Sequence, residues 1–118
     1  MIKNSKLQNL FKLSSKVTVI VPATINTNEE IDNTIYVDRV ASLMSDLFGG
    51  ATATTTLGYW KSPTAGLVKE KSTTVFAYCS ENDLQSGIDK VIDFCTELKD
   101  ELKQDAIALE INGEMYFI

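Results

Sequence analysis

Residues 51–79 read ATATTTLGYWKSPTAGLVKEKSTTVFAYC, and this stretch decides the fold. Two runs rich in threonine, valine and aromatic residues, 51–61 and 67–79, flank a short segment that contains proline and glycine. These runs favour β-strands, and the segment 62–66 is typical of a turn. Because so short a connection joins neighbouring antiparallel strands, we expect the stretch to fold as a β-hairpin.

A helix is expected on each side of this hairpin. Before it, apolar residues recur at helical spacing between an N-cap at Asp32 or Asn33 and a terminating pair, Gly49 and Gly50. After it, Ser80 caps a second helix with the clearest apolar stripe in the chain. This stripe consists of Leu84, Ile88, Val91, Ile92, Cys95, Leu98 and Leu102.

Strands are expected outside both helices. Residues 17–23 are β-branched and almost continuously apolar, which indicates a central strand, and a polar loop follows over 24–32. Near the end, 106–111 and 114–118 flank Asn112-Gly113, a strong hairpin signal. The order β-α-β-β-α-β-β predicts an α+β, ferredoxin-like split βαβ sandwich, an antiparallel sheet with two helices on one face.

The length of 118 residues suits one domain over 17–118, preceded by a basic leader, 1–16, that can form a short helix. The net charge of the chain is −5. Four lysines and no acid precede Glu29, so residues 29–118 together carry a net charge of −9. An acidic body argues against binding extended nucleic acid. The chain contains neither a signal-peptide pattern nor an apolar run of membrane-spanning length, so we expect a cytoplasmic protein without membrane contact.

The sequence lacks the residues on which several common kinds of catalysis depend. The chain has no histidine, and its two cysteines, Cys79 and Cys95, are too far apart in sequence for a CxxC site. We expect both to be buried free thiols. Gly49-Gly50 follows a helix rather than preceding one, which is the wrong order for a phosphate loop. The sequence therefore predicts a non-enzymatic protein with no catalytic residues, metal or cofactor.

The best candidate site is one face of the hairpin. Strand alternation places five residues on one side, away from a helix-packed set formed by 51, 53, 55, 57 and 59. The five residues are Thr52, Thr54, Thr56, Gly58 and Trp60. We add Lys61, Lys69 and Glu70 to the candidate site, because they flank the same hairpin. Hydroxyls, a bare glycine and a stacking tryptophan suit a planar polar ligand. Alternatively, the threonines serve only the strand, Trp60 seals an edge or a dimer contact, and the lysines blunt an edge strand.

Four runs of sequence carry a resemblance: FGGAT (48–52), GYW (58–60), LVKE (67–70) and ALEINGEMYFI (108–118). Over residues 17–118 the chain resembles a set of short uncharacterised proteins of clostridia and related Gram-positive bacteria, often found on plasmids and in phages. The resemblance implies no catalytic role. It implies a mobile-element setting, in which small proteins often neutralise host defence enzymes or their nucleotide messengers.

Two functions follow from these observations. In the first, the protein sequesters a small anionic or nucleotide-like ligand on the open sheet face. In the second, it is an inhibitor or adaptor that binds a host protein, for example in defence, through a sheet edge or the acidic second helix. In either case we expect a homo-oligomer, in the simplest case a dimer, because a single copy leaves one sheet face uncovered.

Overall fold

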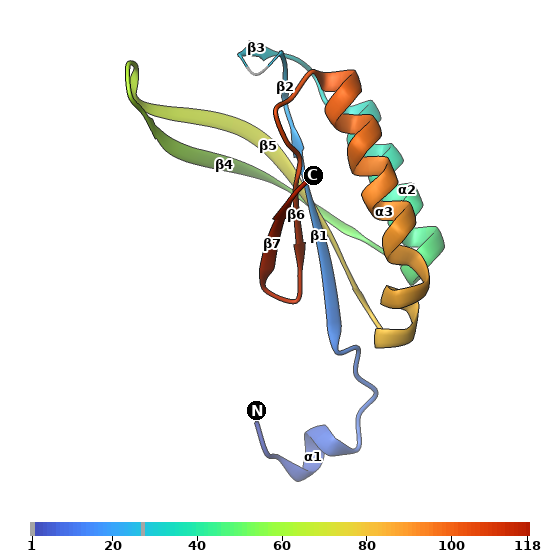
Figure 1. Ribbon diagram of the computed structural model, residues 1–118. Coiled ribbons are helices and arrows are strands. Elements are labelled where there is room, and N and C mark those ends of the chain that lie inside the picture. Colours follow the sequence, from blue (N-terminus) through green and yellow to red (C-terminus); the bar gives the residue numbers. More distant parts are fainter. Residues whose placement is uncertain (1, 27) are drawn as a thin grey trace.

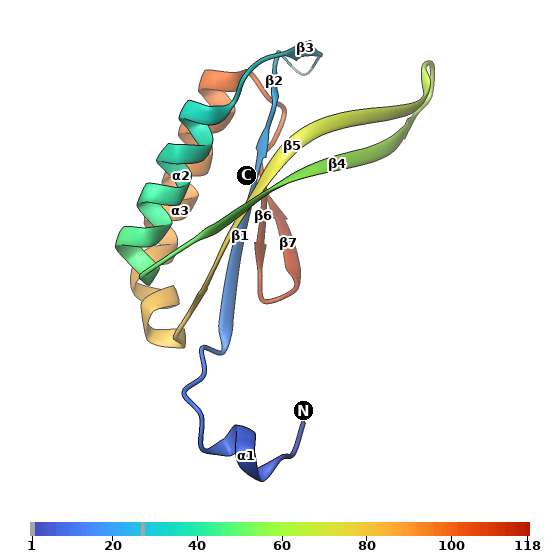
Figure 2. The same ribbon diagram turned by 180° about the vertical axis from the view of Figure 1, so that it is seen from behind.

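The computed structural model describes residues 2–26 and 28–118. Its elements are α1 Ser5–Gln8, β1 Ser15–Pro22, β2 Thr24–Ile25, β3 Glu29–Glu30, α2 Thr34–Phe48, β4 Thr52–Ser62, β5 Gly66–Cys79, α3 Glu81–Leu102, β6 Ala108–Ile111 and β7 Glu114–Phe117. Five strands form one antiparallel sheet in the order β4-β5-β1-β6-β7. Helices α2 and α3 lie side by side on one face of this sheet (Figures 1 and 2). The ferredoxin-like α+β fold is confirmed, with β7 as the added edge strand.

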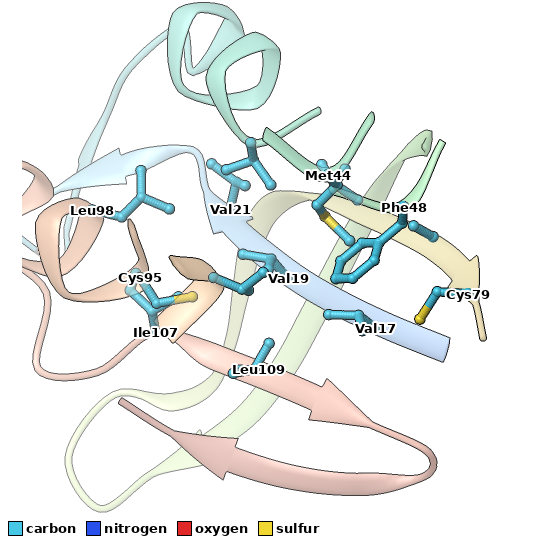
Figure 3. Packing of buried hydrophobic residues seen from close by; sticks show 14 of the residues in the cluster. Val17, Val19, Val21, Met44, Phe48, Cys79, Cys95, Leu98, Ile107 and Leu109 are labelled. Atoms are coloured by element: carbon cyan, nitrogen blue, oxygen red, sulfur yellow. The ribbon is translucent and has the colours of Figure 1, made fainter. Parts of the chain in front are cut away.

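The core lies between the sheet and the two helices. Alternate residues of the central strand, Val17, Val19 and Val21, are fully buried and pack with Met44 of α2 and Leu98 of α3 (Figure 3). Strand alternation sends every second side chain of β1 toward the helices, so the same periodicity leaves its other side chains on the open face.

The helix ends follow the expected local chemistry. Asn33 is the N-cap of α2, and the Asp32 carboxylate accepts a hydrogen bond from the Thr34 N–H at 3.0 Å. Hydrogen bonds from Thr34 lower the pKa of Asp32. Gly49 ends α2 in the left-handed conformation, at φ 92°, and Ser80 caps α3 by accepting from the Asp83 N–H at 3.1 Å.

The hairpin β4–β5 extends well beyond the helices (Figure 2). We expected residues 51, 53, 55, 57 and 59 to pack under the helices, but only Ala51 contacts the core, and Ala53, Thr55, Leu57 and Tyr59 are exposed. The hairpin turns away from the helices along its length, so its outer half has no helix above it (Figure 2). The hairpin is therefore a two-sided arm.

Two other segments differ from expectation or refine it. The stretch expected as a polar loop, 24–32, contains the short antiparallel pair β2–β3, in which Thr24 faces Glu30 and Ile25 faces Glu29. The basic leader, expected over 1–16, is shorter than expected, because Ser15 and Lys16 already belong to β1. Residues 2–14 contain the single helical turn α1 and lie apart from the body (Figure 1). Within residues 2–26 and 28–118, no helix has the length and apolar character needed to cross a bilayer.

Both cysteines are free and buried, as expected. Burial raises the pKa of the Cys95 thiol to about 12. Burial, helped by the negative charge of Asp83, also raises the pKa of Cys79. Because the thiolate is the nucleophilic form, neither sulfur is poised for covalent chemistry in the folded protein.

We expect Ellman's reagent at pH 8 to label the native protein very slowly and the urea-unfolded protein at both thiols. Unfolded thiols ionise near their ordinary pKa, whereas folded Cys95 does not ionise until about pH 12. Its contribution to stability is therefore complete below about pH 9 and is lost as the pH rises from there toward 12. Rapid labelling of native protein at pH 8 would contradict this account of the core.

Candidate functional site

The open face of the hairpin carries the residues that the sequence placed there. In the register of β4 and β5, Ala53 lies opposite buried Val75, which faces the helices. The neighbouring positions on β4 must therefore face the other way. These outward-facing residues are Thr52, Thr54, Thr56, Gly58 and Trp60, so the predicted grouping of the five on the open face is what the register gives.

A cluster of hydroxyl groups occupies the middle of this face. Thr56 Oγ1 lies 2.8 Å from Ser72 Oγ and 3.0 Å from Thr74 Oγ1, so the cluster links β4 to β5. All three residues are partly exposed. Each hydroxyl can donate and accept, so the cluster can exchange its internal hydrogen bonds for bonds to the hydroxyls of a ligand.

Farther out along the hairpin, an acid and an indole form a pair. Trp60 Nε1 donates a hydrogen bond to Glu70 Oε1 at 3.2 Å, and the Trp60 side chain is 47% exposed. Gly58 lies directly opposite Glu70, and a Cβ at Gly58 would meet only the Glu70 carbonyl oxygen, at 3.8 Å, so this part of the open face carries no side chain. The pair therefore presents a flat aromatic surface next to a negative charge.

Glu70 also lines a hollow of about 190 Å³ at the base of the hairpin. The hollow is bounded by the ends of β1 and β2, the two hairpin strands and the connection from α3 to β6. Its lining residues are Ile20, Pro22, Thr24, Gly58, Glu70, Lys71, Ser72, Gln104, Ala106 and Ala108. Among these, Glu70 is the single acid, so it can receive the cationic part of a ligand.

The two lysines of the predicted site lie on the other face. Lys61 pairs with Leu67, and Lys69 pairs with Tyr59, both in the register of the helix-side positions. Lys69 Nζ lies 5.9 Å from the centre of the Tyr59 ring. The structure thus keeps Glu70 with Trp60 but places Lys61 and Lys69 on the opposite face of the hairpin.

Sequence reasoning missed the contribution of the α3–β6 connection. Gln104 Nε2 donates to the carbonyl oxygen of Thr24 at 2.9 Å, which holds this connection against β2 and closes one wall of the hollow. No local motif marks Gln104, because its role depends on a contact with a residue 80 positions away.

The acidic face of α3 stands apart from this site. Its exposed acids include Glu97 and Glu101, and Arg39 of α2 reaches both, at 3.9 Å and 2.8 Å respectively. The arginine partly neutralises the stripe, and such exposed pairs contribute little to stability. The acidic face of α3 is therefore a solvated helix surface that Arg39 links to α2.

The structure is that of a ferredoxin-like α+β protein with a cluster of aromatic and polar side chains on the open face of its sheet. No protein-family model and no curated protein sequence matches the chain. Among solved structures, it is similar to a phage SAM lyase in complex with S-methyl-5'-thioadenosine. The TM-score is 0.64 at 19% identity, over 93% of this chain and 92% of that one.

Two further structures share the fold. The same kind of phage SAM lyase in its apo state matches with a TM-score of 0.63 at 19% identity, over 93% of this chain and 95% of that chain. CutA from Synechococcus elongatus matches with a TM-score of 0.51 at 7% identity, over 94% and 87%. At these identities the similarity establishes the common fold.

The comparison corrects one prediction. We expected a non-enzymatic protein, and that expectation is wrong, because the fold that matches 93% of this chain is the fold of an enzyme, a phage SAM lyase. The expectation rested on missing histidine, metal and nucleophile patterns. Those patterns indicate general-base, metal-assisted or nucleophilic catalysis, so their absence does not by itself exclude an enzyme.

Proposed function

We propose that this protein is a lyase that cleaves S-adenosylmethionine and releases S-methyl-5'-thioadenosine. The observation that carries the proposal is the Trp60–Glu70 pair beside the hollow, on a chain that shares its fold with the phage SAM lyases. The substrate contains one adenine ring, two ribose hydroxyls and two cationic centres. The adenine, the pair of hydroxyls and the cationic end each have a complementary group on the open face.

The proposed binding mode assigns one part of the substrate to each feature. Adenine stacks on the exposed ring of Trp60, a kind of contact worth about 1–3 kcal/mol per base. The ribose hydroxyls exchange hydrogen bonds with Thr56, Ser72 and Thr74. The cationic methionine end enters the hollow and pairs with Glu70.

The proposed reaction requires few catalytic groups from the protein. To leave S-methyl-5'-thioadenosine, the bond between the sulfonium sulfur and Cγ of the methionine part must break, and the sulfur keeps the electron pair. If the substrate's own carboxylate attacks Cγ, the second product is homoserine lactone with its ammonium group still protonated. No proton is transferred in this reaction. The protein then acts by holding the carboxylate close to Cγ and in line with the leaving sulfur.

We further propose that the active form is a homo-oligomer, in the simplest case a dimer. A hollow of about 190 Å³ is smaller than the roughly 300–1,000 Å³ of ordinary ligand pockets, so one chain encloses only part of the substrate. The projecting hairpin exposes Leu57, Tyr59 and Leu67 on its helix-side face. A second copy packed against this face of the hairpin would bury these side chains.

Tryptophan fluorescence tests the site, because Trp60 is the only tryptophan in the chain. Titration with S-methyl-5'-thioadenosine is expected to quench or shift the emission saturably. Calorimetry with Trp60→Ala should give a dissociation constant about 10- to 100-fold higher, as expected for one lost stacking contact. Tyr116→Ala is the matched control, since Tyr116 is also 47% exposed but lies opposite buried Leu109, on the other face. Emission that does not respond to the nucleoside would argue against the site.

A further inference from the structure

The helix-side face of the β4–β5 hairpin, which the proposed site does not use, carries a row of lysines. This face follows the register of Ala53 and buried Val75, so it lies opposite the face that carries Trp60 and Glu70. Three successive cross-strand pairs on it each join one lysine to one large exposed apolar or aromatic side chain. These pairs are Lys61 with Leu67, Lys69 with Tyr59, and Lys71 with Leu57.

The three lysines are accessible, and none of them is paired with an acid of its own chain. All three are exposed, and within residues 2–26 and 28–118 the salt bridges join only Arg39 to acids of α3. Lys69 contacts the Tyr59 ring, and Lys71 also borders the hollow described above. Because the lysines repel one another and the apolar side chains gain free energy when covered, this face favours a partner that is acidic and partly apolar.

Helix α3 presents a row of acids of the opposite charge. Asp89, Asp93 and Glu97 are all exposed and follow one another at intervals of four residues, so they share one face of the helix. Residues 89–97 contain these three acids and one base, Lys90, which gives a net charge of −2. Ile92 lies three residues after Asp89 and is only partly buried, so the row also borders apolar surface.

The two rows also match in spacing. Four residues of an α-helix advance about 6 Å, and two residues of a strand advance about 6.7 Å. Lys69 and Lys71 are two residues apart on β5, and Lys61 takes the next position along the hairpin, on the neighbouring strand. Over three charges the rows therefore differ in length by only about 1.5 Å, which flexible lysine side chains can absorb.

We propose that the helix-side face of the hairpin of one copy binds the acidic row of α3 of a second copy, with Lys69 opposite Asp93. Each is the middle member of its row, so they meet whichever way the helix runs along the hairpin. Within one chain the rows cannot meet, because the hairpin extends away from the helices (Figure 2) and the acids face away from the buried side of α3. In the simplest closed form, two copies exchange hairpins reciprocally. The contact specifies, and rests on, the homo-oligomer proposed above, but not on the cleavage of S-adenosylmethionine.

Cross-linking of the unaltered chain tests the contact without any substitution. Isotopically labelled and unlabelled protein are mixed, left to exchange subunits and treated with a carbodiimide, which joins a lysine amine directly to a carboxylate that touches it. After digestion, mass spectrometry distinguishes links between copies, which carry both isotopes, from links inside one chain. We expect mixed-isotope peptides that join the hairpin lysines to the acids at 89, 93 and 97. Hairpin lysines linked only inside one chain, or not linked to α3, would overturn the proposal.

Exchange of the two central charges provides a second test, read by sedimentation equilibrium at low ionic strength. Lys69→Glu alone and Asp93→Lys alone each place like charges opposite one another and should raise the dissociation constant between copies by about tenfold or more. The double variant restores opposite charges and should associate nearly as tightly as the wild type. Lys12→Glu, a change of the same kind at an exposed position of the leader, should have no effect.

Three results of this second test contradict the proposal. A wild type that stays monomeric at every concentration would leave the hairpin face to an acidic partner other than a second copy. Single variants that associate like the wild type, or a double variant that associates no more tightly than the single ones, would place the contact between copies elsewhere. None of these readouts involves S-adenosylmethionine, so failure of this contact and failure of the proposed activity are distinguishable.

Discussion

Glu70→Gln is expected to lower kcat/KM for the cleavage of S-adenosylmethionine by about 10²-fold or more, the largest effect of any single substitution in the proposed site. The change keeps the shape of the side chain and its acceptor for the Trp60 N–H, but removes the negative charge that faces the hollow. A cationic substrate then loses its counter-charge at a partly buried position. The rate of formation of S-methyl-5'-thioadenosine at low substrate concentration measures this effect.

The matched control is Glu81→Gln, which removes the same charge from an exposed position at the start of α3. Its kcat/KM should equal that of the wild type. If Glu70→Gln and Glu81→Gln retain equal activity, Glu70 does not position the substrate, and the site must lie elsewhere on the molecule. Equal far-ultraviolet circular dichroism of all three proteins establishes that the fold is unchanged.

Leu98→Ala is expected to destabilise the protein by about 2–5 kcal/mol, the largest stability effect that we predict. Leu98 projects from α3 toward the sheet, is 1% exposed and belongs to the single core cluster between the helices and the sheet (Figure 3). Truncation removes buried methyl groups and leaves a cavity among side chains that can relax only in part. Urea unfolding followed by circular dichroism gives the change in the free energy of unfolding.

Ile35→Ala provides the comparison, because Ile35 lies on α2 but is 71% exposed. That substitution should change the free energy of unfolding by no more than about 0.5 kcal/mol. A loss at Leu98 no greater than the loss at Ile35 would mean that α3 does not pack on the sheet as described.

The order of the elements could be predicted because it depends on local patterns. The stripe of α3, the left-handed cap at Gly49 and the Asn112-Gly113 turn each depend on residues close together in sequence. Strand alternation likewise placed Trp60 and the threonines on one face, since the period of two holds along a regular strand. Local sequence patterns could not predict how far the β4–β5 hairpin extends beyond the helices. This extension depends on how far the helices extend over the sheet, which is a property of packing.

The site was predicted only in part, for two physical reasons. First, the grouping of the lysines with Trp60 followed closeness in sequence, whereas neighbouring residues of a strand lie on opposite faces, as Lys61 and Lys69 do. Second, function was judged from missing bases and metal ligands. That judgement presumed a substrate that needs activation, whereas the substrate that we propose, a sulfonium compound, carries its own leaving group. The wall formed by Gln104 depends on a distant contact, which no local pattern reveals.

The central claim is that the open-face site cleaves S-adenosylmethionine, and one measurement tests it most directly. Purified protein is incubated with S-adenosylmethionine, and both substrate fragments are followed by mass spectrometry against protein-free buffer and the Glu70→Gln variant. The account predicts that S-methyl-5'-thioadenosine and homoserine lactone appear in equal amounts, at a rate proportional to wild-type protein and close to the buffer rate with the variant. Consumption of S-adenosylmethionine at the buffer rate in the presence of folded wild-type protein would contradict it.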